Sequence, residues 1–238
     1  VQIRQVLHAW RGISPFTGID AGAAAALEQS VSEVTMYHDE ETAVETPGYT
    51  YYFRYIPFLF LAVLCYSMGY ILLAFRKEDI QKRMLASAIS TRRQNLEGLL
   101  AMFTISLLLW LIAVVGAGVM YGKELLTSKV LGYYLLNTFL MLTIALSLAY
   151  LIGLFMKNIN MLNGISNIIS LGICFLSGVF VPMNIMDKKV LMVAQFLPVY
   201  WYENVNETLS RYHVVSGKVA VDIWKSMGIE AMFIAAFV

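Results

Sequence analysis

The sequence predicts an all-α membrane protein, a polytopic bundle of transmembrane helices. Hydrophobic residues make up 59% of its 238 residues and charged residues only 14%, which leaves too little polar surface to cover a soluble globule of this size. Several uninterrupted apolar runs reach the length of about 20 residues that a helix needs to cross a bilayer. These runs lack the period-two alternation of barrel strands, so helices are the expected structural unit.

Residues 1–50 are expected to lie in water, as the C-terminal part of an extracytoplasmic domain. This segment holds two basic residues, Arg4 and Arg11, against seven acidic ones. Its alanine-rich stretch 21–34 favours a helix, and the acidic stretch that ends at Pro47-Gly48 is typical of a linker. The chain therefore divides into this domain, residues 1–50, and a transmembrane domain, residues 51–238.

The transmembrane domain is expected to contain five spans. They cover about residues 55–75, 99–121, 131–156, 159–181 and 228–238, and the last is too short to cross a bilayer. Because the chain starts with Val1 and ends inside an apolar run, we expect a fragment that lacks the first helix and the end of the last. Ala145, Ala149 and Gly153 recur at helical spacing in the third span, which predicts close helix packing.

The distribution of charge orients these spans. Residues 76–97 hold six basic residues against three acidic ones, and the positive-inside tendency places such a segment in the cytoplasm. Alternation then places residues 1–50 and 183–227 outside a cytoplasmic (plasma) membrane. Tyrosines and tryptophans favour the membrane surface, and they gather at the ends that this topology assigns to the outside, as at Tyr121 and Trp201.

The basic stretch contains a candidate docking helix. Ile80, Met84 and Ala88 lie at i, i+4 and i+8, which places them on one stripe of a helix from Glu78 to Ala88, with Arg83 beside the stripe. Two interpretations stay open. The helix could lie on the membrane surface with its cations at anionic lipid, or it could be a coupling helix in a groove of a cytoplasmic ATPase.

An amphipathic hairpin is expected at residues 183–211, outside the membrane. The stretch 187–197 has one apolar face and is expected to stop at Pro198, and a second short amphipathic turn is expected from Asn204 to Tyr212. Helices this short do not cross a membrane, so the hairpin should lie at the outer surface or dip back into it. It could also be a lid that only packs the outer ends of the spans.

The fourth span carries a polar stripe of Asn160, Asn163 and Asn167 at i, i+3 and i+7. Polar side chains inside a membrane bundle form hydrogen bonds between helices more often than they line a substrate path, and both interpretations stay open here.

Several classes of function are disfavoured. The runs 55–75, 98–122, 130–156 and 158–186 contain no Asp, Glu, Lys, Arg or His, whereas proton relays need ionisable groups at membrane depth. The stretch Gly116–Lys123 has the wrong glycine spacing for a phosphate loop, and neither the two cysteines nor the three histidines have metal-binding spacing. We therefore expect no nucleotide-binding motif, no bound metal, no catalytic residue, no cofactor held by this chain and no nucleic-acid partner.

The chain resembles the membrane (permease) subunit of ABC-2 type transporters. The resemblance rests on the stretch Arg83-Met-Leu-Ala-Ser-Ala-Ile-Ser90 between two spans, on Phe175-Leu-Ser-Gly-Val-Phe-Val-Pro182, and on Phe196-Leu-Pro198 before the last span. It covers about residues 52–238. It implies a type V exporter-like subunit of six helices that pairs with a second membrane subunit, identical or different, and with two cytoplasmic ABC ATPase subunits, which bind ATP and Mg.

On this resemblance we expect the permease subunit of an ATP-driven exporter. Ile80, Arg83, Met84 and Ala88 would receive the movement of the ATPase. The outer hairpin, with Pro182, Leu197, Pro198 and Trp201, would close the outer mouth. The alternative is a membrane scaffold or receptor that carries an outer domain and transports nothing. An intramembrane enzyme is a third and weaker possibility, because the four runs lack catalytic groups.

Overall fold

The computed structural model describes residues 46–86, 90–212, 215 and 217–237, and the described residues form helices without strands. Five long helices carry the fold: α3 (Gly48–Phe75), α5 (Thr91–Leu126), α6 (Leu131–Phe155), α7 (Ile159–Leu176) and α10 (Gly217–Phe237). Shorter elements are α4 (Glu78–Ala86), the 3-10 turn η1 (Met183–Ile185), α8 (Lys188–Ala194) and α9 (Pro198–Arg211). The chain is therefore an all-α polytopic bundle, as the sequence predicts.

Four of the described helices are long and apolar enough to cross a membrane: α3, α6, α7 and the part of α5 from Glu97 to Leu126. Helix α10 begins at Gly217 rather than near Gly228, and its 21 residues include Asp222, Lys225 and Glu230. Helix α3 begins at Gly48, so the boundary expected between residues 50 and 51 falls inside its first turn.

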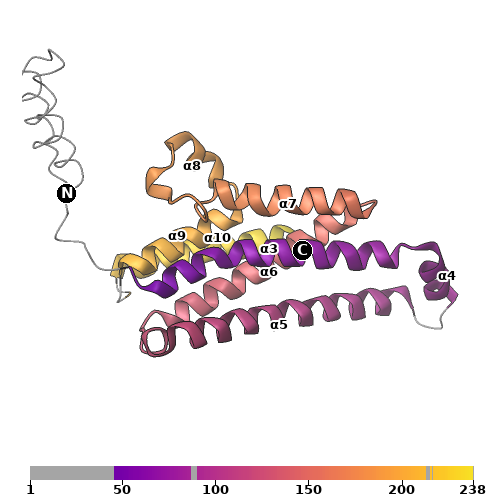
Figure 1. Ribbon diagram of the computed structural model, residues 1–238, viewed down its shortest axis with the longest axis horizontal. Coiled ribbons are helices and arrows are strands. Elements are labelled where there is room, and N and C mark those ends of the chain that lie inside the picture. Colours follow the sequence, from indigo (N-terminus) through magenta and orange to yellow (C-terminus); the bar gives the residue numbers. More distant parts are fainter. Residues whose placement is uncertain (1–45, 87–89, 213–214, 216, 238) are drawn as a thin grey trace, which may run out of the picture. The chain divides into compact units, whose positions relative to one another are not determined.

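Helices α3 and α6 form the centre of the bundle, with α5 along one side and α7 along another (Figure 1). Ala145 and Ala149 of α6 are completely buried, and a Cβ added at Gly153 would meet the Cα atom of Gly69 at 3.4 Å. The two backbones touch at this point because both residues lack a side chain. The close packing predicted from the small residues is confirmed.

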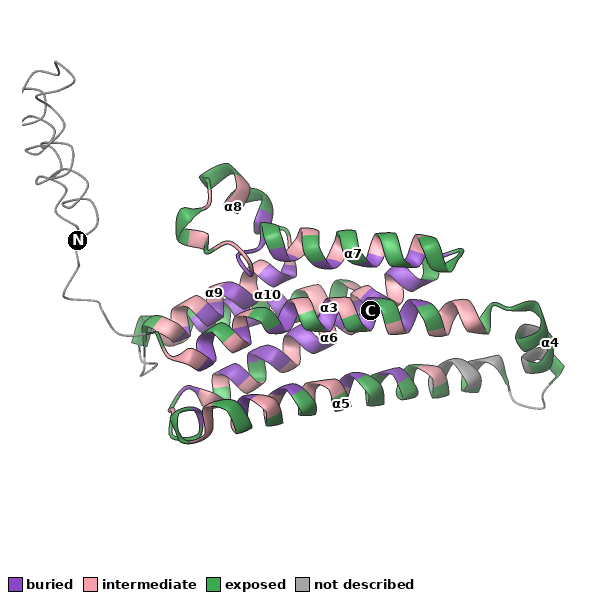
Figure 2. Ribbon diagram, in the orientation of Figure 1, coloured by how far each residue is buried: buried purple, intermediate pink, exposed green. Residues whose placement is uncertain are grey.

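Buried and exposed positions follow the position of each helix in the bundle (Figure 2). Phe53, Phe60, Met141 and Ile144 on α3 and α6 are completely buried. Helices α5 and α7 instead expose apolar side chains such as Ile112 and Ile168, at 68% and 71%. Exposed apolar surface of this size on helices long enough to span suits contact with lipid or with another membrane subunit.

The predicted fourth span continues to residue 181, whereas α7 ends at Leu176. Gly178 follows with φ +97, a conformation that side chains other than glycine rarely adopt. A Cβ at Gly178 would also lie 2.7 Å from the Cγ atom of Met183. The chain therefore turns away from the helix here, before the hairpin of α8 and α9, although the residues remain apolar.

Candidate coupling and gating elements

Helix α4 lies at the end of the bundle away from α8 (Figure 1). It connects to the last turn of α3, and all of its described side chains are exposed, including Ile80 and Arg83. Met84 belongs to this helix, but its side chain is outside the described part, and Ala88 is outside the described residues. An ion pair of 2.8 Å between Lys82 Nζ and Glu78 Oε1 supports the helix along its own surface.

The hairpin brings three of its four predicted residues into one turn. Leu197 precedes α9, Pro198 is its first residue, and the indole Nε1 of Trp201 donates to the Gln195 carbonyl at 2.9 Å. Pro182 lies at the start of the hairpin, before η1, and is exposed. The helix expected in the stretch 187–197 ends at Ala194, before Pro198. Pro198 also begins α9, because proline lacks only an N–H that the first turn leaves unpaired anyway.

Helix α9 packs against α10, α6 and α3. Its buried face consists of Pro198, Val199, Tyr202, Glu203, Val205, Asn206 and Leu209. The second amphipathic element was expected only from Asn204 onward, on the surface. The observed helix is longer and packs into the bundle, so the hairpin joins the spans rather than only covering them.

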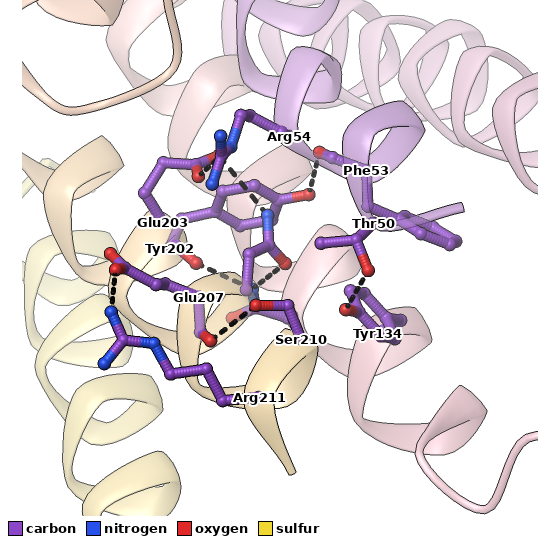
Figure 3. Close-up of polar contacts among 11 residues, drawn as sticks. Thr50, Phe53, Arg54, Tyr134, Tyr202, Glu203, Glu207, Ser210 and Arg211 are labelled. Carbon is purple, nitrogen blue, oxygen red and sulfur yellow. Dashed lines mark hydrogen bonds and ion pairs between the residues drawn. The ribbon is translucent and has the colours of Figure 1, made fainter. Parts of the chain in front are cut away.

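A proline in α3 explains one contact of α9. Pro57 has no N–H to donate to the carbonyl of Phe53, four residues earlier in the same helix. The Tyr202 hydroxyl donates to this carbonyl at 2.7 Å and takes the place of the missing bond (Figure 3). Both groups are buried, where an unpaired carbonyl is costly. Tyr202 therefore supplies a hydrogen bond that α3 cannot make for itself.

An ion pair joins the same two helices. Arg54 of α3 and Glu203 of α9 point toward each other, with Nε 3.4 Å from Oε2, and the side chains are 16% and 2% exposed (Figure 3). Burial raises the pKa of the Glu203 carboxyl to about 8, against the opposing effects of Arg54 and of the hydrogen bond from Asn206. Burial thus makes the charged form of Glu203 more costly, while the nearby Arg54 guanidinium stabilises it.

Amide groups extend these contacts to α6 and α10. Asn137 Nδ2 on α6 donates to the Tyr202 carbonyl at 3.1 Å and lies 3.4 Å from Asn206 Oδ1, while Asn206 Nδ2 donates to Glu203 Oε1 at 3.3 Å. On the other side of α9, Asn204 Nδ2 donates to Ser226 Oγ of α10 at 3.0 Å. Polar contacts thus hold α9 to three long helices. We call five of the residues involved the buried polar cluster: Arg54, Asn137, Tyr202, Glu203 and Asn206.

Sequence reasoning missed this cluster. Glu203 and Asn206 were assigned to an outer surface segment, and Arg54 lies just before the predicted first span. The signal was the spacing of Val199, Tyr202, Asn206 and Leu209, which places them on one face of a helix that starts at Pro198. Glu230 was missed as well: it lies in the predicted fifth span, is completely buried, and neither carboxylate oxygen has a hydrogen-bond partner among the described residues.

The polar stripe of α7 is separate from the cluster. Asn160, Asn163 and Asn167 are exposed, whereas Ser166 and Ser170 on the same helix are buried. The three amides therefore point away from the described bundle, on a helix that is long and apolar enough to cross a membrane.

A family model described as ABC-2 family transporter protein matches residues 19–238. No curated protein and no solved structure matches the sequence.

Proposed function

Because the chain belongs to the ABC-2 family of transporter proteins and is a membrane permease component of an ABC transporter, we propose that it exports its substrate across the cytoplasmic membrane. A separate cytoplasmic ATPase, which binds ATP and Mg, would supply the energy. The observation that carries the proposal is helix α4, a charged helix between two candidate spans whose described side chains are all exposed.

In the proposed mechanism, helix α3 transmits the movement of α4 to α9. It has 28 residues, about 42 Å of helix, and leads from the turn before α4 to the buried polar cluster. At its far end it carries Phe53 and Arg54, which contact Tyr202 and Glu203 of α9. A movement of α4 by the ATPase would shift α3 as a rod and change the position of α9. The hairpin of α8 and α9 would open and close the outer mouth in this way.

A second membrane subunit would cover the asparagine stripe of α7. A primary amide that faces lipid without a partner costs on the order of several kcal/mol, because lipid offers no hydrogen bonds. Asn160, Asn163 and Asn167 are exposed in the single chain, so we expect partners for them from another subunit or from a polar cavity between two subunits. Either arrangement fits a dimer, identical or mixed.

The test of the coupling role is the triple variant Ile80→Ala, Arg83→Ala, Met84→Ala. Its partner-stimulated ATPase activity should fall about tenfold or more, which corresponds to the loss of about 1.4 kcal/mol of coupling. Its melting temperature should change little, since Ile80 and Arg83 are exposed and substitutions at exposed positions alter stability by only about 0.5 kcal/mol. The measurement is ATP hydrolysis by the full-length protein reconstituted with the ATPase that purifies with it.

The matched control is Ile112→Ala, Met120→Ala, Lys129→Ala, which removes the same kinds of side chain from exposed positions on and after α5. It should hydrolyse ATP like the unmodified protein. Full ATPase activity in the α4 variant would contradict the coupling role. If no ATPase purifies with the full-length protein, the proposed exporter fails and the scaffold alternative takes its place.

A further inference from the structure

A cavity of about 580 Å³ opens at the same end of the bundle as α4. It lies between the last turns of α3 and the turn that joins α6 to α7. Arg76, Lys77 and Lys157 line it, and none of its described lining residues is acidic. Three cations around one cavity repel each other and attract an anion. Neither the proposed coupling by α4 nor the buried polar cluster uses this cavity.

Arg76 is held in place by the end of α6. Its Nη1 donates to the Met156 carbonyl at 2.9 Å and its Nη2 to the Leu154 carbonyl at 2.6 Å. These bonds use two of the five N–H donors of the guanidinium, so the others can bind an anion. Because the side chain is already ordered, anion binding costs less conformational entropy than it would with a free arginine.

The first turn of α7 contributes to the same cavity. Asn158 caps this helix, with its Oδ1 atom accepting from the Met161 N–H at 2.8 Å. Asn158, Ile159 and Asn160 all line the cavity, which places the first backbone N–H groups of an 18-residue helix beside the three cations. The positive end of the helix dipole adds to the attraction for an anion.

The rest of the lining is apolar or aromatic. Tyr70, Leu73 and Ile159 line the cavity beside the cations. The cavity also lies where α3 and α6 end and α7 begins, and the ends of candidate spans are expected at the depth of the lipid head groups. Glu78, which begins α4 just after Lys77, is ion-paired with Lys82. A ligand for this site needs an anionic group with apolar chains attached.

We propose that this cavity binds the phosphate group of an anionic phospholipid from the leaflet on the α4 side. Arg76, Lys77 and Lys157 contact the phosphate, and the acyl chains follow the apolar surface of α3 and α7. Basic pockets between transmembrane helices are known binding sites for anionic lipid head groups. The proposal does not depend on export or on the ATPase.

The test measures lipid binding to the detergent-solubilised full-length protein by native mass spectrometry. The probes are dioctanoyl-phosphatidylglycerol, dioctanoyl-phosphatidylcholine and inorganic phosphate. We expect the protein to bind the anionic lipid about tenfold more tightly than the zwitterionic one. The variant Lys77→Gln, Lys157→Gln should lose this preference to within about twofold. Arg76 is left unchanged because its two bonds hold the end of α6.

The matched control is Lys123→Gln, Lys129→Gln, which removes the same charge from exposed positions around the turn between α5 and α6. It should keep the preference for phosphatidylglycerol. Equal binding of the two lipids, or an unchanged preference in the Lys77 and Lys157 variant, would overturn the proposal. Inorganic phosphate binding as tightly as the anionic lipid would make this a small-anion site and would also overturn it.

Discussion

At the scale of single residues, Pro57 and Tyr202 are a matched pair. Proline leaves the Phe53 carbonyl without its partner inside α3, and the Tyr202 hydroxyl supplies that partner from α9 at 2.7 Å. The pairing gives the hairpin a specific point of attachment to a spanning helix. A hydrophobic contact at the same place would leave the carbonyl unpaired and would not fix the rotation of α9.

Tyr202→Phe should lower the free energy of unfolding by about 1 to 3 kcal/mol, because it leaves a buried carbonyl without a partner. In a Pro57→Ala background the same change should cost clearly less, since the alanine N–H can bond to Phe53 within the helix. The measurement is the thermal or denaturant unfolding of all four proteins of this double-mutant cycle.

Tyr200→Phe, two residues away on α9, serves as the control and should be nearly neutral. Equal costs of Tyr202→Phe with and without Pro57 would show that the hydroxyl does not serve the carbonyl.

At the scale of single elements, the asparagine stripe of α7 and the buried face of α9 show what sequence patterns reveal. The i, i+3, i+7 spacing correctly places Asn160, Asn163 and Asn167 on one helical face, because helical geometry is local. The spacing does not show whether that face contacts the same chain or another chain, because such contacts depend on residues that are remote in the sequence. Glu203 was missed for the same reason: its burial depends on α3 and Arg54, which are remote in the sequence.

The α7 face should lie against a second subunit. Asn167→Cys should therefore form disulfide-linked dimers in membranes under mild oxidation, since two copies of the face lie close together in an identical pair. Native cysteines should interfere little, because Cys65 and Cys174 are both buried. The measurement is the amount of dimer on a non-reducing gel.

Ile112→Cys, exposed on α5, is the control that should stay monomeric. Cross-linking at Ile112 but not at Asn167 would place the subunit contact on α5 instead.

At the scale of the whole molecule, the fold class and the four apolar helices could be predicted from the sequence. Length and apolar composition decide whether a helix can span, and both are read directly from the residues. The predicted ends of the helices were less accurate where packing, rather than composition, decides where a helix begins or ends. Apolar residues after Leu176 predicted a longer fourth span, but the chain turns at Gly178, and charged residues hid the start of α10 at Gly217.

The predicted orientation can be tested with a maleimide that does not cross membranes. Lys188→Cys on α8 should react in intact cells, whereas Arg83→Cys on α4 should react only after detergent opens the membrane, because the basic segment is expected in the cytoplasm. Both positions are exposed and the native cysteines are buried, so accessibility to the reagent decides the outcome. The measurement is the mass shift of each variant, and labelling of Arg83→Cys in intact cells would reverse the topology.

The hydrogen bond between Tyr202 and Phe53 also bears on how the protein is made. The two residues are 149 positions apart, so a ribosome that adds about 5 to 20 residues per second delivers Tyr202 roughly 7 to 30 s after Phe53. During that interval α3 rests in the newly forming bundle with one carbonyl lacking its final partner. The native arrangement of the first described helix is thus reached only late in translation, and a nascent chain that stops before α9 displays an incomplete site to the quality-control machinery.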